Sequence, residues 1–135
     1  MRHAKAVRAM VETRRLYRFE KLFFAQGFVA RERSVGYLRD LAARVWRRHG
    51  RKGVRVPDIR IDRTEPVSYC CGYVDIGIVP HQKSIDVLLH ELVHAIGYRT
   101  HGRRFVRKYV ELLVEFGRCD EGELRLALSL FNIRS

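Results

Sequence analysis

The sequence is poor in cysteine and has no long apolar run. Its three cysteines, Cys70, Cys71 and Cys119, are odd in number and form no CxxC pair. This pattern excludes a disulfide-stapled secreted mini-protein and a four-thiolate zinc ribbon. No apolar run approaches the roughly 18 residues that cross a bilayer, so no membrane partner is predicted. We therefore expect a cytoplasmic protein with reduced, partly buried cysteines.

Acidic residues are scarce, but only in one part of the chain. The 135 residues include 27 Lys and Arg against 15 Asp and Glu, a net charge of +12. Residues 1–55 hold 16 basic and 4 acidic residues, whereas residues 56–135 hold 11 of each. This asymmetry favours a polyanionic partner, with non-specific binding of DNA as the first candidate. The residues expected to contact nucleic acid are Arg14, Arg15, Arg44, Arg47, Arg48, Arg51 and Lys52.

The apolar spacing predicts an α+β protein, in which helices precede and follow the strands of a small sheet along the sequence. The predicted helices cover residues 4–24, 34–50, 85–96, 103–116 and 120–131. Alternating apolar residues in 54–61 and 69–79 predict two or three antiparallel strands. The predicted N-terminal caps are Ser34, Ser84 and Asp120, and Gly117 is expected to stop the fourth helix. The length suits one domain, placed at residues 34–135, behind a basic N-terminal arm or helix, residues 1–33.

One segment of the chain carries a recognisable chemistry. Between Val87 and Gly97 the only polar residues are His90, Glu91 and His94. Burying three polar side chains in an apolar helix is costly unless something compensates them. Histidines four residues apart share one helix face, so their ring nitrogens can converge on one ion. HExxH is the zinc metallopeptidase pattern; the alternative is a buried histidine pair satisfied by backbone or carboxylate groups.

A catalytic zinc ion needs a third protein ligand and one open position. His101 is the candidate, although a continuous helix would place it about 10 Å beyond His94 along the axis. Gly97 can end the helix in a left-handed conformation and let the chain turn back. The competing third ligands are Glu111 and Glu115 on the following helix. A metzincin is disfavoured, because His101 comes one residue late for that pattern and no methionine follows it.

The two motifs together point to a family. Residues 90–94 read HELVH and residues 101–105 read HGRRF, and this combination resembles the SprT-like (Spartan) metallopeptidases. The resemblance covers roughly residues 35–117 and implies a minimal gluzincin-like core with the HExxH helix packed on the sheet. It also implies DNA-dependent cleavage of proteins, including proteins crosslinked to DNA. The chain differs in its short His94–His101 interval and in lacking a cysteine-rich zinc ribbon, which the basic residues 1–55 are hypothesised to replace.

The expected activity is therefore that of a zinc-dependent endopeptidase with one Zn²⁺ per chain. His90, His94 and His101 would hold the ion as neutral imidazoles. Glu91 would act as the general base and later pass the proton to the leaving amine. A peptide or protein substrate is expected to add as a strand along Val74–Val79.

The remaining roles are less determined by the sequence. The candidates for stabilising the oxyanion are Tyr69, Tyr73, Tyr98, Arg99 and Arg103. Asp75 is a candidate to orient a zinc-bound histidine from behind, and Phe105 is expected to pack under the zinc helix.

Two other functions fit the same residues. The first is a basic nucleic-acid-binding protein with a purely structural zinc, which would need a fourth protein ligand and would make Glu91 dispensable. The second is a regulatory peptidase of the ImmA type, which would cleave one repressor without DNA and would be insensitive to salt.

Overall fold

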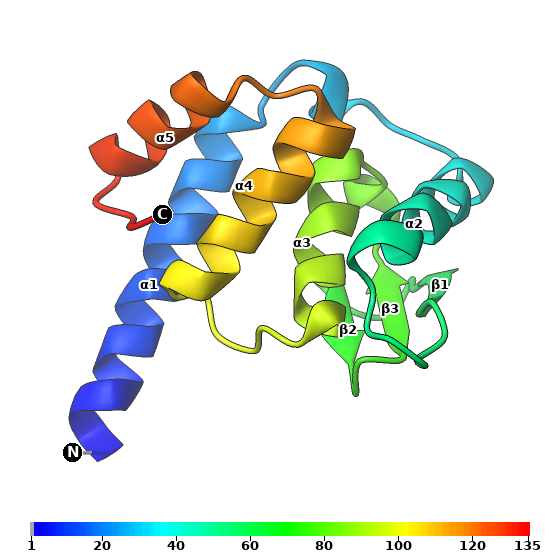
Figure 1. Ribbon diagram of the computed structural model, residues 1–135, viewed down its shortest axis with the longest axis horizontal. Helices are drawn as coiled ribbons and strands as arrows, with labels where there is room; N and C mark the ends of the chain where they lie inside the picture. The colour runs from blue at the N-terminus through cyan, green and yellow to red at the C-terminus, as the bar shows by residue number, and fades with distance from the viewer. Residues whose placement is uncertain (1) are drawn as a thin grey trace.

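The computed structural model describes residues 2–135 and has the α+β architecture that the sequence predicts (Figure 1). The helices are α1 (Arg2–Phe23), α2 (Val35–His49), α3 (Ile85–Ile96), α4 (Arg103–Gly117) and α5 (Glu121–Leu130). The strands are β1 (Asp58–Ile61), β2 (Tyr69–Cys71) and β3 (Asp75–Ile78), and short 3₁₀ turns lie at Phe28–Ala30 and Pro80–Gln82. Within residues 2–135, no helix is both long enough and apolar enough to cross a membrane.

Helix α3 lies at the centre of the structure. It contacts α2 and α4 as well as β2 and β3. A helix that is apolar on nearly every side must be surrounded by other elements, and Leu88, Leu89, Leu92 and Val93 are fully buried. The same surroundings enclose the polar side chains that α3 carries.

Helix α1 joins the common core from its middle onward. Leu16 and Phe19 are fully buried, and the Phe19 ring packs against the rings of Phe24 and Phe131. The N-terminal end of α1 projects past the other helices, whereas its second half runs beside α4 and α5 (Figure 1). The segment predicted as a basic arm thus supplies part of the core, and this position brings its polar residues to α3.

Two of the three predicted caps are confirmed. The side chains of Ser34 and Asp120 each accept a hydrogen bond from the backbone N–H three residues further on. Ser84 stands at the N-cap of α3 without making such a bond, because its hydroxyl donates to Asp86 at 2.7 Å instead. A buried carboxylate without hydrogen-bond donors is costly, and Asp86 is buried beside Ser84.

The expected role of Gly117 is wrong. Gly117 is still helical, and Arg118 takes the left-handed conformation with φ 57°. A Cβ on Gly117 would lie 2.8 Å from Cγ1 of Val29. The glycine is therefore needed for close packing against the Phe28–Ala30 turn.

The sheet is mixed, which corrects the expected antiparallel arrangement. The strand order is β1-β3-β2, with β3 parallel to β1 and antiparallel to β2. Gly72 and Tyr73, with φ 59° and 65°, form a tight turn between β2 and β3, in which the Val74 N–H bonds the Cys71 carbonyl at 3.2 Å. The chain crosses over after β1 and returns through β2, so that β3 enters the sheet between the other two strands. Alternating apolar residues predict where strands lie in the sequence but not which strands are adjacent in the sheet.

This order also overturns the predicted docking edge at Val74–Val79. Because β3 is hydrogen-bonded on both sides, it has no free edge for a peptide. The outer edges of the sheet belong to β1 and β2. The strand predicted over residues 54–61 is shorter than expected, since Trp46 ties the Val54 carbonyl to α2 with a 2.7 Å hydrogen bond.

Candidate metal centre

Three histidines converge beside α3. His90 and His94 lie one turn apart on α3, and His101 lies on the loop that leads to α4. The Nε2 atom of His101 is 3.1 Å from Nε2 of His90 and 3.1 Å from Nε2 of His94. Among residues 2–135, these three form a group of side chains that could hold a metal ion.

The turn at Gly97 brings His101 back to the helix. Gly97 has φ 132° and ψ 7°, a backbone conformation that favours glycine. The Gly97 N–H bonds the carbonyl of His94, and the Tyr98 N–H bonds that of Val93. The helix therefore ends at Ile96, two residues after His94, as the sequence predicts, and the chain returns over the same face.

Each of the three rings is held at its other nitrogen. The Nδ1 atom of His90 lies 2.6 Å from the Glu20 carboxylate, and that of His94 lies 2.7 Å from the Tyr98 carbonyl. The Nδ1 atom of His101 lies 2.9 Å from the Thr13 hydroxyl. Partners at Nδ1 fix the orientation of a metal-binding imidazole and leave Nε2 free for the ion. All three rings share this arrangement.

Sequence reasoning missed two of these partners, Thr13 and Glu20. Both lie on α1, seven residues apart and hence on one helix face. That spacing was visible in the sequence, but only the tertiary structure brings this face of α1 against α3. Asp75, the residue proposed to orient a histidine, belongs to the central strand and has no side-chain hydrogen bond to any of the three histidines.

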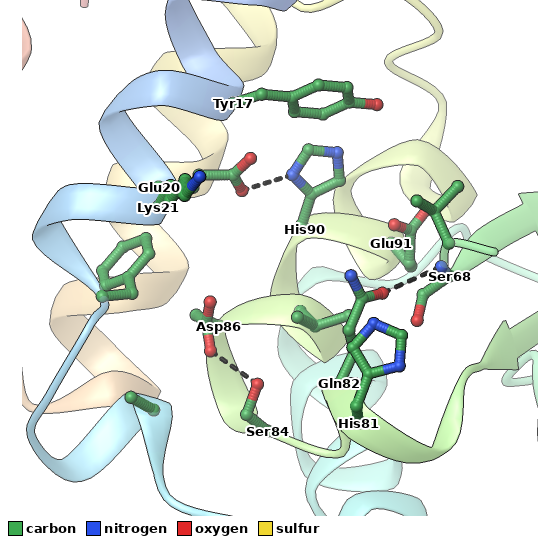
Figure 2. A pocket seen from close by; sticks show the side chains of 14 residues that line it. Tyr17, Glu20, Lys21, Ser68, His81, Gln82, Ser84, Asp86, His90 and Glu91 are labelled. Atoms are coloured by element: carbon green, nitrogen blue, oxygen red, sulfur yellow. Dashed lines mark hydrogen bonds and ion pairs between the residues drawn. The ribbon is translucent and has the colours of Figure 1, made fainter.

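Glu20 is the centre of a small buried network. Its Oε2 atom accepts from the Tyr109 hydroxyl at 2.8 Å and also faces His90 Nδ1 (Figure 2). Burial by itself would lower the pKa of His90, but the adjacent Glu20 carboxylate outweighs it and raises that pKa. Burial raises the pKa of Tyr109 well above its usual value, and Glu20 adds to this. The Tyr109 hydroxyl therefore remains a donor to Glu20.

The pKa values of His94 and His101 shift in the opposite direction, downward. Burial, followed by the charge on His90, lowers the pKa of His94 to about 4. The same two causes lower the pKa of His101 to about 3. Both rings are therefore neutral near pH 7, as a metal ligand must be.

The arrangement fits a tetrahedral metal ion with nitrogen ligands. Two imidazole nitrogens that bind the same tetrahedral zinc ion, each at about 2.1 Å, stand about 3.4 Å apart. The observed Nε2–Nε2 separations of 3.1 Å are close to this value. The Phe105 ring lies 4.8–5.0 Å from all three imidazole centres and is buried. Phe105 thus packs beneath the cluster, as expected, and restricts how the rings can move.

In comparisons with models of known protein families, with curated proteins and with solved structures, nothing matches this chain. The chemistry of the site therefore has to be argued from its own residues.

Glu91 lies next to the cluster, between two cavities. One cavity of about 450 Å³ extends from His90 towards Asp86 and His81 (Figure 2). The other, of about 480 Å³, contains all three histidines. The residues that line both are Tyr17, Val67, Ser68, His90 and Glu91. Burial raises the pKa of the Glu91 carboxyl to about 7, although the neighbouring His90 charge lowers it, and a pKa near the working pH suits a general base.

The predicted oxyanion donors are mostly engaged elsewhere. Tyr69 donates to Asp62 at 2.6 Å, and the Tyr98 ring faces Arg104. Tyr73 and Arg99 bond each other at the rim of the second cavity.

The Tyr17 ring on α1 lies beside two of the three histidines. Its ring centre is 5.6 Å from that of His101 and 6.1 Å from that of His90. Figure 2 shows the Tyr17 ring alongside His90, across the cavity from Glu91. Burial, with the charges of Glu91 and Glu20, raises the pKa of its hydroxyl, which therefore stays protonated and able to donate.

The competing third ligands are not near the cluster. Glu115 pairs with His49 at 2.6 Å and with Arg48 at 3.0 Å. Glu111 pairs with Lys108 at 3.1 Å. Glu111 also lies 3.5 Å from the His49 imidazole, so both carboxylates serve to join α4 to the end of α2.

The residues predicted to contact nucleic acid are all exposed but lie on separate surfaces. Arg14 and Arg15 are on α1, whereas Arg44, Arg47 and Arg48 are on α2. Arg51 and Lys52 follow α2, and the Arg51 guanidinium lies 5.3 Å from the centre of the Tyr73 ring. The structure thus divides the predicted basic patch into two parts.

Proposed function

We propose that the protein is a zinc-dependent endopeptidase of the SprT-like kind, in which His90, His94 and His101 hold the ion. One observation carries the proposal: three imidazoles direct Nε2 to a common point while separate acceptors hold each Nδ1. A buried histidine pair satisfied by carboxylate or backbone groups would need only one contact per ring. Metal binding explains why both nitrogens of every ring are directed.

A catalytic role is favoured over a structural one by the number of ligands. Structural zinc sites are closed by four protein ligands, whereas catalytic sites use three and leave one position open. In the described part of the chain, the candidate ligand group contains three residues and no fourth. The three histidines and Glu91 line one cavity of about 480 Å³, through which a substrate would reach the ion.

The residues of the site have distinct proposed roles in peptide hydrolysis. A bound zinc ion would supply Lewis-acid polarisation of the scissile carbonyl and would acidify a water molecule. Glu91 takes the proton of the attacking water on a carboxylate oxygen and returns it to the leaving amine. Tyr17 donates its hydroxyl proton to the developing oxyanion, and Tyr17→Phe should then lower kcat with little change in KM.

The substrate is proposed to bind along β2. Tyr69 and Cys70 of this strand line the same cavity as the three histidines, and the outer edge of β2 has no strand partner within residues 2–135. An extended peptide could pair with this edge and pass over the metal centre. Given the net charge of +12, we propose that proteins associated with DNA are the substrates.

The test compares Glu91→Gln with the wild type and with His101→Ala. Zinc content by elemental analysis should be about one per chain in the wild type and in Glu91→Gln, and sharply lower in His101→Ala. Cleavage of an unfolded protein substrate, with and without single-stranded DNA, should fall at least about 100-fold in Glu91→Gln. Zinc retained by His101→Ala, or full cleavage by Glu91→Gln, would contradict the proposal.

A further inference from the structure

A third cavity, of about 540 Å³, lies where α1, the loop at His101 and Gly102, the start of α4 and the C-terminal segment meet. Figure 1 shows the N-terminal end of α4 and the C-terminus both lying beside α1. Four arginines line this cavity: Arg8, Arg15, Arg103 and Arg134. We refer to it below as the arginine cleft.

The charges in the arginine cleft are not neutralised. In the described part of the chain, none of the four guanidinium groups lies within 4 Å of a carboxylate. Arg15 donates to the Asn132 carbonyl at 3.2 Å, which leaves its charge in place. Glu12 is the only acidic residue that lines the cleft. Four cations around one cavity repel each other, and a bound anion would relieve this repulsion.

The start of α4 adds to the positive potential. This 15-residue helix has Gly102 as its N-cap, with no side chain capping it and no acidic residue in its first turn. Its first residues are Arg103 and Arg104, although the positive end of a helix ordinarily favours acids. The Glu12 carboxylate of α1 lies near this end, since a Cβ on Gly102 would be 3.3 Å from its Oε2. Backbone N–H groups at a helix start can bind phosphate oxygens. The helix end and the arginines therefore favour the same kind of ligand.

We propose that the arginine cleft binds the phosphate backbone of a nucleic acid. Arg8 and Arg15 are seven residues apart on α1, or about 10 Å along the helix axis, so the charges extend beyond the size of one phosphate group. Arginine also binds phosphate oxygens in pairs, through its planar fork of donors. Further exposed cations, Arg2 and Lys5, continue along α1 and suit a polymeric ligand.

This inference rests on the nucleic-acid part of the proposed function and does not depend on peptide hydrolysis. It also selects between the two parts into which the structure divides the basic residues predicted from the sequence. The cleft includes Arg15 but neither the α2 arginines nor Arg51 and Lys52. Two of its residues, Arg103 and Arg134, come from the part of the chain whose net charge is zero.

The test measures the binding of a fluorescent oligothymidylate of about twenty nucleotides to the full chain by anisotropy at several salt concentrations. Arg8→Gln with Arg103→Gln removes two charges from the cleft, and Arg44→Gln with Arg47→Gln removes two from α2 as a matched control. The cleft pair should bind at least about tenfold more weakly at ~0.1 M salt, and its log–log salt slope should fall by about 1.4. The control pair should change affinity less than about threefold. Circular dichroism checks that both variants fold.

Two outcomes would overturn the proposal. Equal losses in both double variants would mean that binding follows total charge and not the cleft. Displacement of the oligonucleotide by inorganic phosphate at fixed ionic strength, in the wild type but not in the cleft pair, would indicate a site for a free phosphate. The assay measures nucleic-acid binding and not peptide hydrolysis. A protein without peptidase activity can therefore still support the cleft proposal, and an active peptidase can still contradict it.

Discussion

Glu20 holds one histidine of the candidate metal centre from behind. A single oxygen of its carboxylate faces both His90 Nδ1 and the Tyr109 hydroxyl. Glu20→Gln should weaken zinc binding about 10- to 100-fold, because it removes the negative charge that orients the His90 ring and makes it more basic. Competition with a chromogenic chelator measures this loss.

The Glu20→Gln variant should also change the number of protons released when zinc binds. Glu20 raises the pKa of His90, so zinc binding near pH 7 should displace a proton from that ring in the wild type. In Glu20→Gln the pKa of His90 should fall and fewer protons should be released. Calorimetry in two buffers with different ionisation enthalpies gives the number. Glu32→Gln, at an exposed carboxylate that pairs with Lys83, is the control, and an unchanged proton count in Glu20→Gln would contradict the assignment.

Asp86 shows how a cavity residue can cost stability. Burial raises the pKa of its carboxyl from 3.8 to about 6, so the folded state disfavours the ionised form. The destabilisation is absent below about pH 4, grows as the pH rises, and is complete above about pH 6. Asp86→Asn, which keeps an acceptor for Ser84, should therefore raise the free energy of unfolding by about 2–3 kcal/mol near pH 8 and hardly at all near pH 4.

Urea unfolding at the two pH values measures this difference. Asp58→Asn, at an exposed position at the start of β1, should change stability by less than about 0.5 kcal/mol at either pH. A stabilisation by Asp86→Asn that is the same at both pH values would show that ionisation of Asp86 is not its cause.

At the scale of elements, the end of α3 decides whether the third histidine reaches the other two. Gly97 has φ 132°, and a Cβ there would meet no atom within 4 Å. The cost of Gly97→Ala is therefore one of backbone conformation alone, about 1–2 kcal/mol of unfolding free energy. Because the strained turn precedes His101, zinc affinity should fall as well.

Gly36→Ala is the matched control for this element. Gly36 lies in the first turn of α2, where a Cβ would come no closer than 3.9 Å to Ser34 Oγ. Alanine should stabilise that helix by about 0.5 kcal/mol and leave zinc affinity unchanged. Denaturant unfolding and chelator competition on both variants test the pair, and loss of zinc binding in Gly36→Ala would remove the special role given to Gly97.

At the scale of the whole molecule, the metal centre joins parts of the chain that are far apart in sequence. Thr13 and Glu20 come from α1, His90 and His94 from α3, and His101 from the loop before α4. Zinc should therefore stabilise the complete fold, by about 2.7 kcal/mol at a free concentration of 100 times Kd. For a chain of this length the rise in Tm is on the order of 10 °C.

Thermal unfolding with zinc and with excess chelator measures this effect. His101→Ala should abolish the zinc-dependent rise in Tm, whereas His81→Ala, at an exposed histidine outside the cluster, should retain it. An equal rise in both variants would place the stabilising ion elsewhere.

The local features of the site could be predicted from the sequence because they depend on residues close together in the chain. The spacing of His90 and His94 determines that they share a helix face. The apolar surroundings of α3 imply its burial, and Gly97 makes the return of His101 feasible. The helices and the capping by Ser34 and Asp120 follow from equally local rules.

Tertiary structure alone decided which distant segments meet. The order β1-β3-β2 depends on the crossover between β1 and β2, and alternation of apolar residues contains no information about it. Likewise, α1 reads as a basic arm, because its sequence does not reveal that Leu16 and Phe19 join the core. That packing places Thr13, Tyr17 and Glu20 at the metal centre and Arg8 and Arg15 at the arginine cleft. The sequence by itself determined the three candidate ligands and the candidate base, whereas the packing of α1 decided what orients the ligands, since contacts between distant segments depend on the complete fold.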